Sequence, residues 1–263
     1  MNGSILEWRT PTDRSLRPGS LGEGFGAHFQ KSSEWGALTK EQLQRLDEVG
    51  VCRRYKAGEV LFHQGDKAQG VYYVRDGLVC IRKHDAQGNS FIIRRLAFAG
   101  NSIGLRPFLA EETNRSSAET LTPSTVCFVH ASVVRDMIKA TPDFGCRILK
   151  VMALALGAAE DAYFENVTMS ADLRLAHLML LLKDHYGKQL SDGSIMIDLP
   201  VSWRNISSLI GVRPESMSRV IRKLENDGVA DFSGHTICWH HIERLLGELD
   251  LETSSEQLSR MSD

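Results

Sequence analysis

The sequence predicts an α+β fold in which a strand-rich part, one long helix and a pair of short helices with a hairpin follow one another. Three observations predict this order. Short apolar runs separated by glycine fill residues 51–131, helical spacing of small and apolar residues fills 141–167, and two short helical patterns meet at a glycine within 202–224. Because 263 residues suffice for two domains of ordinary size, we expect the strand-rich part and the helical end to fold as separate units.

Composition is typical of soluble globular proteins, with 42% apolar and 24% charged residues. The formal net charge of -2 gives no general attraction to nucleic acid, although a local basic face is sufficient for binding. Five basic residues gather in one stretch: Arg204, Arg213, Arg219, Arg222 and Lys223. The N-terminus lacks the apolar segment of a signal peptide, and no apolar run approaches the roughly 20 residues of a membrane helix. We therefore expect a cytoplasmic protein without a membrane partner.

The chain has five cysteines: Cys52, Cys80, Cys127, Cys146 and Cys238. They are widely spaced, odd in number and contain no C-x-x-C pair, so we expect reduced thiols rather than a disulfide framework. The sequence has no P-loop, no G-x-S-x-G, no H-E-x-x-H and no strong catalytic pairing. We therefore expect no enzymatic activity, no catalytic residue and no metal site.

Residues 1–37 are rich in Gly, Ser, Arg and Pro, and we expect a poorly ordered arm there. A domain at 38–140 begins with a short amphipathic helix that Thr39 can cap, with Leu43 and Leu46 on its apolar face. Short strands follow at 58–65, 70–77, 78–84, 90–100 and 124–130. Turn signals at Asp76-Gly77 and Gly88-Asn89 separate some of them, and many short strands at this spacing predict a sandwich or a barrel-like roll.

Residues 141–168 predict one long helix, because Thr141 can cap it and Pro142 suits its first position. Small and apolar residues recur along it and form a predicted seam: Ile148, Met152, Ala155, Ala159 and Ala162. Small residues let two helices approach closely, so we expect this helix to pair with a second copy of the chain. The alternative is a helix buried on its own strand-rich domain.

The domain at 169–251 begins with a helix that Ser170 can cap, followed by a short strand at 195–199. Ser202 and Pro214 mark the starts of two short helices, with Gly211 at the turn between them. A hairpin follows at 229–239, then a final helix at 241–251 and a polar tail at 252–263. The order is typical of a winged helix-turn-helix, whose wing can contact phosphate.

The second short helix carries chemistry that can recognise base pairs. Met217, Val220, Ile221 and Leu224 have the spacing of a buried face, and a polar set shares the opposite face: Glu215, Ser218, Arg219 and Arg222. Arg can bond guanine with two hydrogen bonds, Glu can accept from cytosine, and Ser can do either. The alternative is an amphipathic hairpin whose charges are only solvated, but the pattern favours DNA recognition.

The order of roll, long helix and winged helix-turn-helix resembles the CRP/FNR superfamily of bacterial transcription regulators over about residues 38–250. The runs KAGEVLFHQGD and GVYYVRDGLVCI look like the family's cyclic-nucleotide-binding-type β-roll, and GNSIGLRPFLAEETNRSSAET is similar to its effector cassette. The turn glycines of this roll would be Gly58, Gly65, Gly77 and Gly100. The family's FNR-type pattern E-x-x-S-R stands here as Glu215, Ser218 and Arg219.

This resemblance implies a homodimeric, sequence-specific transcription regulator that recognises a palindrome of TTGA/TCAA half-sites in double-stranded DNA. Glu215, Ser218 and Arg219 would contact bases. Phosphates would be bound by a second set: Ser202, Arg204, Arg213, Arg222 and Lys223. The family also implies RNA polymerase as a partner and an effector or redox signal at the β-roll. The alternative function is a ligand-binding signalling module of the cyclic-nucleotide type that does not act on DNA.

The effector cassette departs from that of the cyclic-AMP receptor. The candidate pocket residues are Gly104, Leu105, Arg106, Arg115, Ser116, Ala159 and Glu160. Arg115 and Ser116 match the receptor's phosphate-binding pair, but Leu105 stands where an acidic residue would hold the ribose. A buried ligand hydroxyl left unpaired costs about 1–3 kcal/mol, so we expect no tight binding of cyclic AMP. We expect Arg115 to bond carbonyls or carboxylates of the cassette instead.

No cysteine precedes Cys52, so the N-terminal cysteine cluster that holds the iron–sulfur centre of the oxygen sensor FNR is missing and we expect no such centre. Haem is another effector class of the superfamily, with these candidate axial ligands: His28, His63, His84, His130, Cys52 and Cys80. No C-x-x-C-H motif accompanies them, and each is more commonly a core or surface residue. A redox-sensing thiol stays an alternative to a bound effector.

Overall fold

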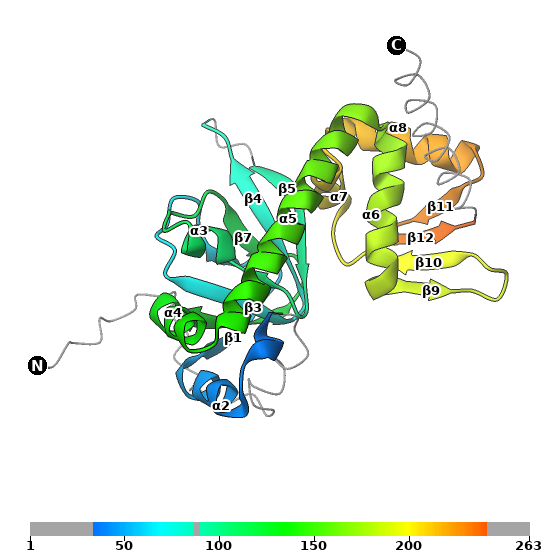
Figure 1. Ribbon diagram of the computed structural model, residues 1–263. Helices are drawn as coiled ribbons and strands as arrows, with labels where there is room; N and C mark the ends of the chain where they lie inside the picture. Colours follow the sequence, from blue (N-terminus) through cyan, green and yellow to red (C-terminus); the bar gives the residue numbers. More distant parts are fainter. Residues whose placement is uncertain (1–33, 87–89, 241–263) are drawn as a thin grey trace, which may run out of the picture.

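The computed structural model describes residues 34–86 and 90–240, and it has the α+β architecture expected from the sequence. A β-roll and a helical domain lie side by side, and one long helix runs from the first to the second (Figure 1). The N-terminal arm up to residue 33, the turn at Gly88-Asn89, the final helix and the polar tail lie outside the described residues.

The described chain begins with the short 3-10 helix η1 (Trp35–Ala37) and the helix α2 (Lys40–Val49). Thr39 caps α2 as predicted, because its hydroxyl accepts a hydrogen bond from the Gln42 backbone N–H while the Gln42 side chain accepts one from the Thr39 N–H. Leu43 and Leu46 are buried, which confirms the predicted apolar face.

The β-roll consists of two four-stranded antiparallel sheets with the orders β1-β8-β3-β6 and β2-β7-β4-β5. Its strands are β1 (Val51–Tyr55), β2 (Val60–Phe62), β3 (Gly70–Asp76), β4 (Leu78–His84), β5 (Ser90–Phe98), β6 (Ser102–Ile103), β7 (Ser117–Thr120) and β8 (Ser124–His130). The predicted turn at Asp76-Gly77 joins β3 to β4. Gly77 is required there, since its φ is 93° and a Cβ would lie 2.2 Å from the Ser124 hydroxyl oxygen.

Two helices of this domain were not predicted: α3 (Leu105–Leu109) and α4 (Ala131–Ala140). The stretch at α4 has buried apolar residues three apart, at Ala131, Val134 and Met137, which is helical spacing. Both helices are short and lie within a region dominated by strand signals, so their patterns were obscured.

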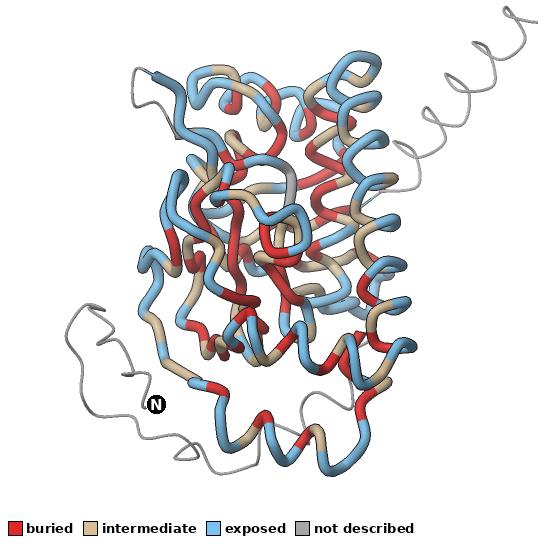
Figure 2. Tube along the Cα trace, turned by 60° about the vertical axis from the view of Figure 1, so that its left-hand side comes forward, coloured by how far each residue is buried: buried red, intermediate tan, exposed pale blue. Residues whose placement is uncertain are grey.

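The long helix α5 (Pro142–Thr168) has Pro142 at its first position, as expected. Thr141 does not cap it with its side chain; instead the Thr141 hydroxyl accepts a hydrogen bond of 2.7 Å from the Gln42 amide. Phe144 and Ile148 are buried in the cluster around Trp35, so Ile148 packs inside its own subunit and not in a seam with a second copy. From residue 153 onward the helix is exposed or half-buried along its whole length (Figure 2).

Within residues 169–240, the described part of the helical domain has three helices and a small sheet. Its elements are α6 (Ala171–Tyr186), β9 (Gly187–Gln189), β10 (Ile195–Asp198), α7 (Trp203–Leu209), α8 (Pro214–Asn226), β11 (Ala230–Ser233) and β12 (Thr236–Trp239). The sheet order is β11-β12-β10-β9. Ser170 makes no side-chain capping bond to α6, unlike the prediction. The wing turn consists of Gly234 and His235, because Ser233 pairs with Thr236.

The two domains share a core, although we expected them from the sequence to fold as separate units. One buried cluster joins Leu78, Cys80 and Phe98 of the β-roll with residues of α6, α7 and α8. The rings of Phe98 and His185 stack with centroids 3.9 Å apart. The helical domain is therefore docked on the sheet that contains β4 and β5.

The expectation that all cysteines are reduced is wrong for one pair. Cys52 and Cys127 form a disulfide between β1 and β8, where they are direct partners in the antiparallel register. Their 75-residue separation concealed the pairing in the sequence. The other three cysteines, Cys80, Cys146 and Cys238, are free thiols.

Candidate nucleic-acid interface

The helix-turn-helix consists of α7 and α8, and side-chain bonds fix its start. Ser202 caps α7 as predicted, since its hydroxyl accepts a hydrogen bond of 3.4 Å from the Asn205 N–H. The Trp203 indole donates to the Gly234 carbonyl at 2.8 Å, which ties α7 to the wing turn. Gly211 has a φ of 69° at the turn between the helices, a conformation that suits glycine. The sequence did not reveal the role of Trp203.

Helix α8 has one buried face and one exposed face. Met217, Val220 and Leu224 are buried, while Ile221 is half-buried. The polar face predicted from the sequence is exposed in full, with the three predicted base-contacting residues Glu215, Ser218 and Arg219 and the predicted phosphate ligand Arg222. These residues are spaced by three and four, so they share one side of the helix. The arrangement presents a carboxylate, a hydroxyl and two guanidinium groups to solvent on a rigid element.

Besides Arg222, three predicted phosphate ligands are exposed: Ser202 and Arg204 at the start of α7, and Arg213 directly before α8. Lys223 differs, because its ammonium group donates a hydrogen bond to the Asp172 carboxylate at the start of α6. Burial would raise the pKa of Asp172, but hydrogen bonds from Lys223 and Ser170 hold that pKa below its usual value. Lys223 therefore joins α8 to α6 in the free protein.

This pair predicts an acid-dependent contribution to stability. The pKa of Asp172 is lowered on folding, so its stabilising effect is complete above the unfolded-state pKa of about 4 and is lost as the pH falls through the lower folded-state pKa. The difference in unfolding free energy between the wild type and Asp172→Asn should be constant from pH 5 to 7 and shrink below pH 4. Urea unfolding across this range measures it, and a difference that grows in acid would contradict the pairing.

The cassette residues do not assemble a nucleotide-binding set. Leu105 is 1% exposed and packs in the same cluster as Trp35, so it offers no polar atom to a ligand. The Arg115 guanidinium makes two 3.0 Å hydrogen bonds to the Glu112 carboxylate, which Arg106 also contacts at 3.0 Å. This confirms the expectation that Arg115 bonds a carboxylate of the cassette.

The remaining candidate residues of the effector pocket differ in burial and lie on different elements. Gly104 has a φ of 85° and precedes α3, and Ser116 is half-buried beside β7. Ala159 and Glu160 are exposed on α5. The pKa of the Glu112 carboxyl is lowered by its hydrogen bonds from Arg106 and Arg115, so this carboxylate holds both guanidinium groups at neutral pH.

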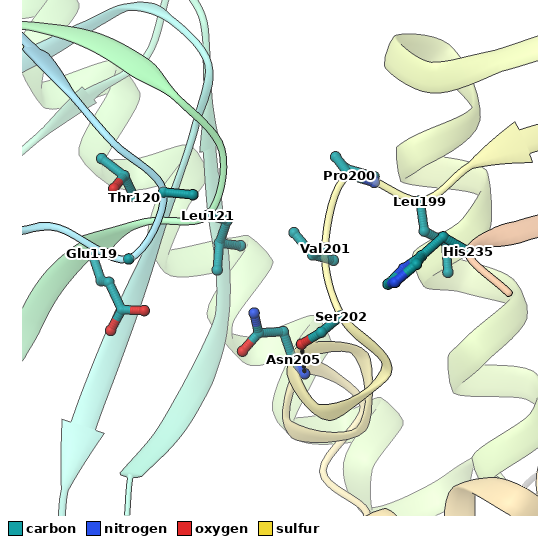
Figure 3. Close-up of a pocket in the computed structure, with 11 residues that line it drawn as sticks. Glu119, Thr120, Leu121, Leu199, Pro200, Val201, Ser202, Asn205 and His235 are labelled. Carbon is teal, nitrogen blue, oxygen red and sulfur yellow. Dashed lines mark hydrogen bonds between the residues drawn. The ribbon is translucent and has the colours of Figure 1, made fainter.

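A cleft of about 490 Å³ lies elsewhere, between the β-roll and the helix-turn-helix. Glu119, Thr120 and Leu121 line one side, and the segment from Leu199 to Ser202 with Asn205 and His235 lines the other (Figure 3). None of the predicted effector residues lines this cleft.

Beside this cleft, Arg82 connects the two domains. Its guanidinium lies 2.8 Å from Glu119 and donates a 2.8 Å hydrogen bond to the Asn205 side-chain oxygen in α7. The Ile92 backbone N–H also donates to the Ser208 hydroxyl at 2.8 Å. Sequence spacing could not indicate these contacts, since Arg82 and Asn205 are 123 residues apart.

We expect Arg82→Ala to lower the free energy of unfolding by about 1–3 kcal/mol, because it leaves Glu119 and Asn205 without their partner in a half-buried place. Chemical denaturation measures the change. Lys83→Ala, the exposed neighbour on the same strand, is the matched control and should cost less than about 0.5 kcal/mol. Equal effects of the two substitutions would contradict a role of Arg82 in domain docking.

Candidate metal and haem ligands are not brought together. Among residues 34–86 and 90–240, no group of three His, Cys, Asp or Glu side chains could hold a metal ion. Cys52 is bonded to Cys127, and His130 accepts the backbone N–H of Ser132 at the start of α4. His28 lies outside the described residues. No helix in the described part of the chain combines the length and apolar character that crossing a membrane requires.

Comparison with known proteins identifies the family. The family of cyclic nucleotide-binding domains matches residues 52–141, and that of Crp-like helix-turn-helix domains matches residues 173–248. A probable transcriptional activator of Rhizobium leguminosarum bv. viciae is 29% identical over 194 residues, 74% of this chain and 79% of the relative. The cAMP-activated global transcriptional regulator CRP of Salmonella typhimurium is 25% identical over 186 residues, 70% of this chain and 87% of the relative. This chain belongs to the CRP/FNR family.

The CRP/FNR regulator described here is a DNA-binding transcription regulator, as predicted, and its family consists of transcription regulators and not of enzymes. The alternative of a signalling module without DNA function is therefore not upheld. Its fold is also that of solved members: the structure of FixK2 from Bradyrhizobium japonicum superposes with a TM-score of 0.66 at 24% identity, covering 76% of this chain and 96% of FixK2.

Proposed function

We propose that this regulator acts as a homodimer whose two α8 helices recognise TTGA/TCAA half-sites of one palindrome. The observation that carries this proposal is the exposed face of α8, which presents Glu215, Ser218 and Arg219 together. Arg219 contacts guanine, and Glu215 and Ser218 contact neighbouring base pairs. Arg204, Arg213 and Arg222 bind phosphates with Ser202, and Lys223 joins them when it leaves Asp172.

The dimer contact of this proposal lies on α5, at a different angle from the predicted seam. Leu149, Leu156 and Tyr163 are seven residues apart and 63%, 62% and 74% exposed. Ala153 and Val167 follow Leu149 and Tyr163 by four residues, and Glu160 follows Leu156, so five of six positions of a two-stranded coiled-coil repeat are apolar. So large an apolar row on a solvent-facing helix supports pairing with a second copy.

A dimer recognises such a palindrome when its two recognition helices lie about 34 Å apart and enter successive major grooves. Gel shifts on a TTGA-N6-TCAA duplex and on a scrambled duplex, each at several salt concentrations, test the proposal. We expect the palindrome to bind at least a hundredfold more tightly than the scrambled duplex. Equal affinity for both would refute base recognition, while affinity for one half-site equal to that for two would refute the dimer.

The cassette supports a regulator that does not bind cyclic AMP tightly, because Leu105 is buried and Arg115 is bound to Glu112. RNA polymerase is the further partner that the family suggests. In this proposal the chain divides into a sensor domain at 38–140, a dimerisation helix at 141–168 and a DNA-binding domain at 169–251.

A further inference from the structure

The disulfide of Cys52 and Cys127 has unusual backbone geometry. The two residues are opposite each other in β1 and β8, and their Cα atoms are 3.9 Å apart. Closely opposed residues in antiparallel sheets have Cα atoms about 4.5 Å apart, and disulfides usually join Cα atoms about 4.4–6.8 Å apart. The Cα atoms of Cys52 and Cys127 are therefore closer than is usual for paired strands or for disulfides. Disulfides outside the usual geometry are more easily reduced.

The two cysteines pack on the same core cluster but differ in burial. Cys52 is half-buried on β1, which is an edge strand of its sheet, so it is the more exposed of the two bonded cysteines. Cys127 is fully buried and belongs to the cluster that contains Trp35, Phe144 and Ile148. Phe144 and Ile148 are the buried residues through which the first turns of α5 pack on the β-roll. The bond thus connects an accessible strand to the base of the long helix.

We propose that Cys52 and Cys127 form a reversible redox site. Its oxidation state alters how the first turns of α5 pack on the β-roll, and thereby the DNA affinity of the regulator. The inference rests on the proposed dimer, in which α5 sets the spacing of the two α8 helices. Reduction lets the two Cα atoms move apart, which loosens the cluster at the base of α5. We assign the higher DNA affinity to the oxidised protein.

The chemistry is thiol–disulfide exchange with low-molecular-weight thiols such as glutathione. A glutathione thiolate attacks the Cys52 sulfur, forms a mixed disulfide there and releases the Cys127 thiolate, which takes up a proton. A second glutathione thiolate attacks the mixed disulfide, releases Cys52 and leaves as oxidised glutathione. Two electrons pass to the protein, and oxidised glutathione reverses both steps.

The three free cysteines differ in ways that suit them as controls. Cys80 is fully buried, and burial raises the pKa of its thiol to about 12, so it is unreactive at neutral pH. Cys238 has its sulfur 3.7 Å from the Ser194 hydroxyl. Cys146 is exposed on α5 and reports on general thiol access.

The first experiment measures the bond itself. The full chain is equilibrated in buffers of reduced and oxidised glutathione, quenched with acid, alkylated in denaturant and analysed by mass. Because five cysteines are present and three are free, the number of alkylated cysteines should rise from three to five in one step as the buffer becomes more reducing. A bond that resists reduced glutathione and yields only to dithiothreitol would overturn the proposal, as would five free thiols in every buffer.

The second experiment measures the consequence. The affinity of the wild type for the TTGA-N6-TCAA duplex should fall about tenfold between the oxidised and the reduced buffer. Cys52→Ser should show the reduced affinity in both buffers, Cys127→Ala should agree with it, and Cys146→Ser should follow the wild type. Equal affinities of the wild type in both buffers would refute the switch, and a rise on reduction would refute the assigned direction.

If neither state binds that duplex, the proposed half-site has failed rather than the redox site. In that case the dimer dissociation constant, measured by sedimentation in both buffers, tests the redox site. We expect reduction to raise it at least threefold in the wild type and to leave that of Cys52→Ser unchanged. An unchanged constant in the wild type would overturn the proposal.

Discussion

Replacing Arg219 with alanine is expected to weaken binding to the TTGA-N6-TCAA duplex by about 1–3 kcal/mol, which is about 5- to 150-fold. The Arg219 side chain is exposed on α8, one helical turn from Glu215, and its guanidinium can make two hydrogen bonds to a guanine. Removing a base contact costs affinity only where the correct base is present. Binding to duplexes substituted at each position of one half-site should therefore show discrimination lost at a single base pair.

Arg204→Ala is the matched control for this prediction. Arg204 is also an exposed arginine of the helix-turn-helix, but it lies on α7, where we expect a phosphate contact. Its loss should weaken binding to all duplexes alike and reduce the slope of log affinity against log salt by about 1. If Arg219→Ala instead weakens random DNA as much as the palindrome, Arg219 is a phosphate ligand and our assignment is wrong.

Features set by a few neighbouring residues could be predicted from the sequence. The caps at Thr39 and Ser202, the turn at Gly77 and the two faces of α8 all depend on local spacing. Each is determined within one or two turns of chain, where backbone hydrogen bonding and side-chain periodicity leave few alternatives. The exposed face of α8 follows directly from this periodicity.

Features that depend on distant pairing could not be predicted. The disulfide requires the register of β1 against β8, and the bridge from Arg82 to Asn205 requires the docking of one domain on the other. Apolar residues lie on more than one face of α5. Periodicity alone therefore does not tell which face packs on the β-roll of the same subunit and which stays exposed. The structure resolves this for Ile148, which faces the β-roll about 100° around the helix from Leu149.

Because Leu156 lies on the same exposed face of α5 as Leu149, its substitution tests the proposed dimer contact directly. We expect Leu156→Glu to raise the dimer dissociation constant at least a hundredfold and to abolish binding to the palindrome at concentrations that saturate the wild type. Two leucines lose their burial, which costs about 3–6 kcal/mol in total, and two carboxylates face each other across the contact. Each 1.4 kcal/mol corresponds to a factor of ten. Sedimentation and gel shifts measure the two effects.

Leu154→Glu is the control that separates the contact from general surface chemistry. Leu154 is 65% exposed, close to the 62% of Leu156, but two residues along a helix place it about 160° away around the axis. It lies outside the repeat of Leu149, Leu156 and Tyr163, so the same substitution should leave both the dimer and DNA binding within about twofold of the wild type. If Leu154→Glu dissociates the dimer and Leu156→Glu does not, the copies meet through the opposite side of α5, and the recognition helices then take a different spacing from the one we propose.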